Sequence, residues 1–112
     1  MGAYTGALAG LALSGACHAG ELACVAQAQC RGDAQAMCAP SSLKIKVSAE
    51  NRLWIDAQGP YGARLSREGD ARVWTIRAFG GAHALRVEAD GAFLYLGNRG
   101  KRYRGTCREV IQ

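Results

Sequence analysis

Positive charge gathers near the end of the chain. Arg99, Lys101, Arg102, Arg104 and Arg108 follow one another with no Asp or Glu among them. Alternate residues of a β-strand share a face, so a strand here places Arg102, Arg104 and Arg108 on one side. Evenly spaced guanidinium groups bind carboxylates and phosphates through paired hydrogen bonds. Two interpretations stay open: a contact surface for an anionic partner, or an edge strand that its charges protect against aggregation.

Trp54 is a further candidate contact residue. It lies between Arg52 and Asp56, on the polar side of an alternating segment. The ring is either covered by the loop between Cys30 and Cys38 or exposed as a stacking platform for a sugar ring. Cover by a loop is the routine arrangement for an aromatic side chain.

The chain has five cysteines, and a cleaved leader containing Cys17 would leave Cys24, Cys30, Cys38 and Cys107. Four cysteines in a small exported domain indicate two disulfides, with three possible connectivities. Cys30 and Cys38 enclose a short polar loop that closes easily, which leaves Cys24 to pair with Cys107. The spacing does not match a tetrahedral zinc site, and a single His remains beside these cysteines. We expect neither a metal ion nor a cofactor.

Residues 1–20 carry no Asp, Glu, Lys or Arg. Their apolar centre, Ala7–Leu13, precedes small residues at Ala16–Gly20, which is the pattern of a secretory signal peptide without its usual basic start. We predict a cleaved signal peptide over residues 1–19 and a single β domain over residues 20–112. The expected location is periplasmic or extracellular.

Other interpretations of this N-terminal segment remain. Cleavage after Ala16 competes with cleavage after Ala19, since small residues precede both positions. The residues before Cys17 loosely resemble a bacterial lipobox, which would make the protein lipid-anchored at that cysteine. A packed helix is disfavoured by the repeated glycines. A transmembrane span needs about 20 mostly apolar residues, and we predict none.

Residues that could perform catalysis are few. His83 shares strand parity with Leu85 and Val87, which indicates a core or barrel-end histidine. Ser41 and Ser66 lack the sequence context of a nucleophile elbow. The Arg31–Asp33 tripeptide matches an integrin-binding sequence, but a tight polar turn is the simpler interpretation. We expect that the protein is not an enzyme.

The elements that must position these residues are strands. Apolar and polar residues alternate with a period of two, with turn residues every eight to twelve positions. Gln58–Pro60 is expected to be a turn, and Asp90–Gly91 a type I′ hairpin turn with positive φ at both residues. Helix is expected only within Asp33–Met37. The predicted strands cover residues 22–27, 43–48, 52–56, 61–65, 73–78, 85–88, 93–96 and 101–108.

This pattern predicts an all-β fold: a small antiparallel meander of about eight short strands that curls into a disulfide-stapled barrel or sandwich. A bridge between Cys24 and Cys107 would join the first strand to the last, and closure would remove both exposed edges. At 112 residues the chain forms one domain, which we expect to be a monomer.

Lys and Arg exceed Asp and Glu by 14 to 9, a net charge of +5. In an exported protein this charge favours anionic envelope glycans, lipid head groups or an acidic protein as partners, and not nucleic acid. The sequence therefore predicts a small exported binding protein without enzymatic activity.

The layout resembles the small bacterial periplasmic inhibitors of c-type lysozyme, which are compact β-barrels. The resemblance covers the architecture and the Tyr103–Cys107 ending. That family's inhibitory Ser and Lys motif around a Trp is not reproduced, because Trp74 is followed by Thr75, Ile76 and Arg77. The resemblance implies a barrel fold and no site residue. It makes inhibition of an envelope-acting enzyme, such as a lysozyme, the alternative function.

Overall fold

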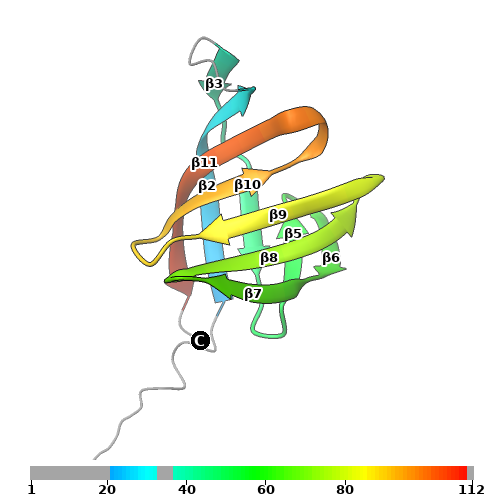
Figure 1. Ribbon diagram of the computed structural model, residues 1–112, viewed down its shortest axis with the longest axis vertical. Helices are drawn as coiled ribbons and strands as arrows, with labels where there is room; N and C mark the ends of the chain where they lie inside the picture. Colours follow the sequence, from blue (N-terminus) through cyan, green and yellow to red (C-terminus); the bar gives the residue numbers. More distant parts are fainter. Residues whose placement is uncertain (1–20, 33–36, 111–112) are drawn as a thin grey trace, which may run out of the picture.

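The computed structural model describes residues 21–32 and 37–110 (Figure 1). The predicted signal peptide, its cleavage positions and Cys17 lie outside these residues, as does Asp33 of the predicted Arg31–Asp33 turn. Ten strands and one 3₁₀ turn follow in order: β2 (Glu21–Arg31), β3 (Cys38–Pro40), β4 (Lys44–Val47), β5 (Arg52–Ile55), β6 (Gln58–Gly62), β7 (Arg64–Glu68), β8 (Ala71–Ala78), β9 (Gly81–Val87), β10 (Ala92–Leu96), η3 (Asn98–Gly100) and β11 (Lys101–Val110).

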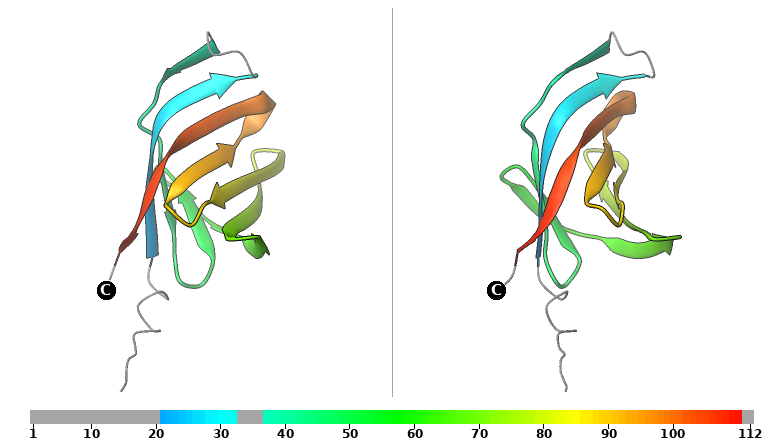
Figure 2. Two further views of the ribbon diagram at one scale, coloured as in Figure 1. Left: turned by 60° about the vertical axis from the view of Figure 1, so that its left-hand side comes forward. Right: turned by 90° about the vertical axis from the view of Figure 1, so that its left-hand side faces the viewer.

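The strands form one antiparallel sheet in the order β6-β5-β4-β2-β11-β10-β9-β8-β7, and β3 pairs with the far end of β2. The sheet bends so that β8, β9 and β10 cross β2, β4 and β5 at a steep angle (Figure 1). Strands β2 and β11 run side by side along most of their length (Figure 2). The predicted all-β, barrel-like meander is confirmed.

Alternation of apolar and polar residues builds the core, because successive side chains of a strand point to opposite faces. Leu53 and Leu85 are fully buried, and the other inward-facing residues pack around them. Burying a side chain of this size contributes about 1.5 to 3 kcal/mol. The core also includes Leu22, Cys24, Ile45, Val47, Trp74, Ile76, Val87, Phe93 and Tyr95.

Two disulfides staple the sheet, and both predicted pairings are confirmed. Cys24 of β2 bonds Cys107 of β11, and Cys30 of β2 bonds Cys38 of β3. In both cases the two residues lie directly opposite each other in the strand register. Such bonds indicate an oxidising, exported environment.

The strand count differs from the expected eight at two places. The predicted strand over 61–65 divides at Ala63 into β6 and β7, and the short β3 was not predicted. The expected turn at Gln58–Pro60 is wrong, because these residues belong to β6 and the chain turns at Asp56, whose φ is 51°. β6 is an edge strand, where a proline without an N–H is tolerated.

The barrel does not close completely, so the expectation that closure removes both edges is wrong. Strands β6 and β7 remain as edges and follow one another in the chain. Asn51 spans the gap between them: its Oδ1 accepts a hydrogen bond from Trp74 Nε1 at 2.9 Å, and its carbonyl accepts one from the Ala63 N–H at 2.9 Å. Every residue of β7 is exposed, and Arg64, Arg67 and Glu68 supply it with charge that discourages edge pairing.

The hairpin between β9 and β10 is present, but its turn is not type I′. The N–H of Gly91 donates to the Glu88 carbonyl at 3.0 Å, and Gly91 has a φ of 95° while Asp90 does not have a positive φ. The Asp90 carboxylate instead accepts the N–H of Ala92 at 3.0 Å. A Cβ on Gly91 would lie 2.9 Å from the Cys107 carbonyl oxygen, so glycine is needed here.

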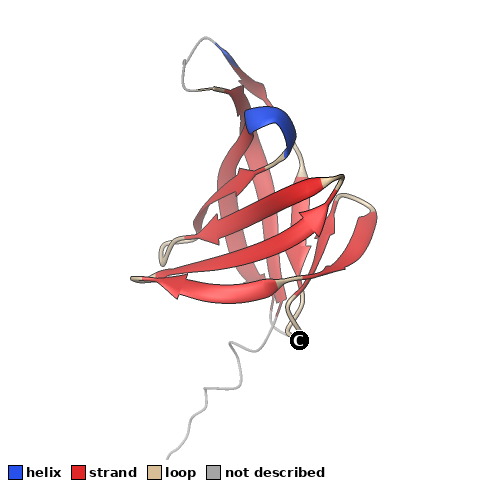
Figure 3. Ribbon diagram, turned by 45° about the vertical axis from the view of Figure 1, so that its right-hand side comes forward, coloured by secondary structure: helices blue, strands red, loops and turns tan. Residues whose placement is uncertain are grey.

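The turn between β10 and β11 contains the 3₁₀ segment η3, drawn blue between these strands in Figure 3. Arg99 within it has a φ of 58°. Helical structure was expected only within Asp33–Met37, so η3 is a correction. The described residues include no helix with the length and hydropathy that crossing a bilayer requires.

Candidate functional site

Strand β11 lies inside the sheet, between β2 and β10. The alternative explanation of its charges, protection of an edge strand, is therefore wrong. Its register against β2 shifts between Arg104 and Gly105. A Cβ on Gly105 would clash with the carbonyl oxygen of Val25.

The five predicted cations divide into three groups. Arg104 and Arg108 are exposed on the outer side of the sheet, and half-buried Arg102 shares their parity, while Tyr103 and Cys107 pack against the core. The other two are placed differently: Lys101 lines a pocket at one end of the barrel and Arg99 lies in η3.

Strand register brings other residues to the side of Arg104 and Arg108. On β2, Ala23 lies between Arg108 of β11 and Lys46 of β4. Lys46 in turn lies opposite Trp54 of β5. Directly paired residues share a face, so these side chains form a row across four strands. We call this side the outer basic face and define it by Lys44, Lys46, Trp54, Arg104 and Arg108.

Trp54 is half-buried on this face. The Nζ atom of Lys46 lies 5.3 Å from the centroid of its ring, a cation–π distance. The described strand of the Cys30–Cys38 loop, β3, pairs with β2 and not with β5. Among the described residues, a lysine side chain from the neighbouring strand therefore lies over the ring.

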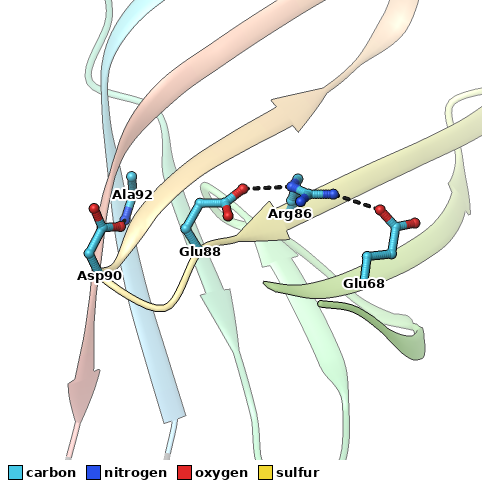
Figure 4. Close-up of polar contacts among 5 residues, drawn as sticks. All are labelled: Glu68, Arg86, Glu88, Asp90 and Ala92. Carbon is cyan, nitrogen blue, oxygen red and sulfur yellow. Dashed lines mark hydrogen bonds and ion pairs between the residues drawn. The ribbon is translucent and has the colours of Figure 1, made fainter. Parts of the chain in front are cut away.

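Elsewhere on the surface, some cations form ion pairs with acids. Arg86 binds Glu68 through Nη1 and Glu88 through Nε, each at 2.6 Å (Figure 4). The hydrogen bond that Arg86 donates to the Glu88 carboxylate is the main cause that raises the pKa of Arg86 above its usual value. A third ion pair joins Arg72 to Glu109 at 3.3 Å.

Within the described part of the chain, no cation of the outer basic face takes part in an ion pair. The carboxylate of Asp56, at the margin of the face, accepts the backbone N–H of Lys44 at 3.0 Å. The barrel thus has one side whose described cations form no ion pair and another where acids pair with Arg86.

A pocket of about 180 Å³ opens at the end of the barrel near the β8–β9 and β10–β11 turns. It was not predicted from the sequence. Its walls combine apolar and aromatic side chains with a few polar groups: Leu43, Ile55, Phe79, His83, Tyr95, Gly97, Asn98, Lys101 and Tyr103.

Aromatic rings form a continuous row through this pocket. From Tyr61 through Phe79, His83 and Tyr95 to Tyr103, successive ring centroids are 5.8, 5.6, 5.6 and 5.9 Å apart. The sequence did contain a signal for part of this row. His83, Tyr95 and Tyr103 have inward-facing positions on the adjacent strands β9, β10 and β11. Sequence reasoning assigned His83 to the core without joining it to the others.

His83 is buried, as predicted. Its Nε2–H donates to Asn98 Oδ1 at 2.9 Å, and its Nδ1 accepts the hydroxyl hydrogen of Tyr95. Burial raises the pKa of Tyr95 well above its usual value, with further contributions from the phenols of Tyr103 and Tyr61. His83, Tyr95 and Asn98 thus hydrogen-bond to one another, and all three line the pocket.

Among the described residues, no three His, Cys, Asp or Glu side chains lie close enough to hold a metal ion. Two candidate surfaces remain: the outer basic face and the barrel-end pocket. Comparison of the chain with protein-family models, curated proteins and solved structures finds no match.

Proposed function

We propose that the protein is a small exported binding protein, periplasmic or extracellular and without enzymatic activity, that contacts an anionic envelope component through the outer basic face. The observation that carries this proposal is the strand register. It gathers cations from β4 and β11 with Trp54 of β5 on one side of the sheet, where no described acid pairs with them.

The chemistry of the face fits carboxylates and phosphates. The guanidinium groups of Arg104 and Arg108 offer paired hydrogen bonds, while Lys44 and Lys46 add compact positive charges. The underlying sheet is fixed by the Cys24–Cys107 disulfide. A sheet that is already rigid loses little backbone conformational entropy on binding. Envelope glycans, lipid head groups and acidic proteins present the matching negative charge.

The test is binding of the oxidised domain to vesicles that contain phosphatidylglycerol, to lipopolysaccharide and to polyglutamate across a salt series. Arg104→Ser with Arg108→Ser should weaken binding to the vesicles about 30-fold, since each cation near an anionic bilayer contributes about 1 kcal/mol. Binding should also weaken as ionic strength rises, because salt screens exposed charges.

A matched control removes the same charge elsewhere. Arg67→Ser with Arg77→Ser takes two exposed cations from β7 and β8, leaves Arg64 and Glu68 on the edge strand, and should change binding much less. If both double variants weaken binding equally, net charge and not the outer basic face is responsible. Equal binding by the parent and the Arg104/Arg108 variant would refute the proposal.

Inhibition of an envelope-acting enzyme stays the alternative, and the same preparations test it. A c-type lysozyme assay with the parent protein should show no inhibition under our proposal. Inhibition that survives loss of the outer basic face would favour the alternative.

A further inference from the structure

We propose that the barrel-end pocket binds a small molecule made of one aromatic ring and a carboxylate. The ring would lie among the apolar and aromatic walls, and the carboxylate would contact Lys101 at the rim. This site is separate from the outer basic face, since Lys101 has the parity of core-packed Tyr103 and not that of Arg104.

The volume of the pocket sets the size of the ligand. An apolar cavity of about 150 Å³ accepts benzene, so a pocket of about 180 Å³ has room for a single ring and little more. Leu43 and Ile55 supply aliphatic wall, while Phe79 and Tyr103 offer faces and edges for an aromatic guest. Aromatic pairs gain energy beyond the area that they bury, which favours an aromatic over an aliphatic ligand.

Phe79 is the least expected residue of the pocket. It occupies the tip of the β8–β9 hairpin with a φ of 54°, next to Gly80 with a φ of 81°. Turns with two positive φ values favour Asn-Gly, and a bulky residue there is a conformational outlier. Its ring is 49% exposed and lies 5.6 Å from His83. Residues held in unfavourable backbone conformations cluster at functional sites. The position of Phe79 at the mouth of the pocket is therefore what we expect of a ligand contact.

Positive charge stands at the rim. Lys101 lies directly opposite Arg31 in the β2–β11 register, and like charges in this arrangement destabilise a sheet. In the described part of the chain, Lys101 has no ion pair. A carboxylate bound beside Lys101 in the pocket would offset this repulsion.

Three other polar side chains of the pocket already have hydrogen-bond partners within the protein. His83, Tyr95 and Asn98 are hydrogen-bonded to one another, and no buried side-chain nitrogen or oxygen of the described residues lacks a partner. A sugar, with hydroxyl groups around its ring, would leave most of them unpaired against this wall. The matching ligand is apolar at one end and anionic at the other.

The test is a calorimetric titration of the oxidised domain with phenylacetate, phenylacetamide, cyclohexylacetate and acetate. We expect saturable binding of phenylacetate. The neutral amide should bind about tenfold more weakly, because a hydrogen bond to an ionised group is the stronger kind. Acetate should not bind measurably, and cyclohexylacetate should be weaker than phenylacetate.

Variants separate the two ends of the ligand. Lys101→Met should reduce phenylacetate affinity to that of phenylacetamide and leave the amide unchanged. Phe79→Asn restores a residue that suits the turn, so it should weaken both ligands without lowering the melting temperature. A fall in melting temperature with unchanged affinity would mean that Phe79 serves the fold alone.

Lys44→Met, on the outer basic face, is the matched control for loss of one lysine and should bind phenylacetate like the parent. The Arg104→Ser, Arg108→Ser variant should do the same, so failure of the function proposed for the outer basic face would not affect this result. Absence of saturable phenylacetate binding to the folded parent, or equal affinity for phenylacetate and phenylacetamide, would overturn the inference.

Discussion

At the scale of single residues, Gly105 determines how closely β11 can approach β2. It is buried at the register shift, and a Cβ there would clash with the Val25 carbonyl oxygen and lie 2.7 Å from the Ala26 Cα. These are backbone atoms, so a rotamer change cannot make room. The close approach of the two strands at the register shift thus depends on the absence of a side chain at Gly105.

Gly105→Ala should therefore destabilise the protein by about 3 kcal/mol, at the upper end of the usual cost of overpacking. Gly62→Ala is the control, because nothing lies within 4 Å of a Cβ at that position and its φ is not positive. The control should change stability by about 0.5 kcal/mol or less. Urea unfolding measures both, and similar values for the two variants would contradict this account of the bulge.

Tyr95 gives a second prediction, on pH. Because its pKa is raised in the folded protein from the ordinary value of 10.0, folding favours the neutral phenol. The stability it contributes is complete below about pH 10 and is lost as pH rises further, at up to about 1.4 kcal/mol per pH unit.

Tyr95→Phe removes this dependence, but it leaves the Nδ1 atom of buried His83 without its donor, at a cost of about 1 to 3 kcal/mol near neutral pH. The difference in unfolding free energy between parent and variant should shrink between about pH 9 and about pH 11. A constant difference over that range would show that the phenol ionises equally easily in both states.

At the scale of elements, the strands that follow strict alternation could be predicted from the sequence. The period of two alone predicts that Arg104 and Arg108 face away from Tyr103 and Cys107. The number of cysteines and the short loop between Cys30 and Cys38 predict the disulfide pairing. The division of 61–65 at Ala63 could not be predicted, because alternation continues across the corner.

The composition of both candidate sites also depended on strand order. Trp54 and Arg108 are far apart in the sequence, and they share a face because β2 and β4 lie between their strands in the sheet. Pairing between distant segments leaves no local signal. Phe79 does have a local signal in the sequence: it is an aromatic residue before Gly80-Gly81, at a position where a turn favours Asn or Gly.

The two disulfides should contribute unequally. Their sequence separations are 83 for Cys24–Cys107 and 8 for Cys30–Cys38. In the chain-entropy model these separations correspond to about 4.5 and about 2.5 kcal/mol. Replacing Cys24 and Cys107 with Ala should thus lower stability about 2 kcal/mol more than replacing Cys30 and Cys38. Urea unfolding of the two double variants checks this, and the reverse order would show that strain or residual structure outweighs loop length.

At the scale of the whole molecule, the two candidate sites occupy different parts of the barrel. The outer basic face covers β5, β4, β2 and β11, and the pocket opens at the end where Lys101 begins β11. The opposite end holds Glu21 and Val110, which are partners in the register. A molecule lying with the outer basic face on an anionic surface would therefore keep its pocket mouth at the side, within reach of solvent.

The proximity of Glu21 and Val110 also bears on how the fold is encoded. If a short linker joined these residues and the chain were opened at the corner between β6 and β7, the strands would follow in the order β7, β8, β9, β10, β11, β2, β3, β4, β5 and β6. Apart from β3, that is the order of the sheet itself. Such a circular permutant would have a much lower contact order, because the β2–β11 pairing would become a hairpin instead of the meeting of the chain's two ends. The Cys24–Cys107 bond would then span only a short loop and lose most of its entropic contribution.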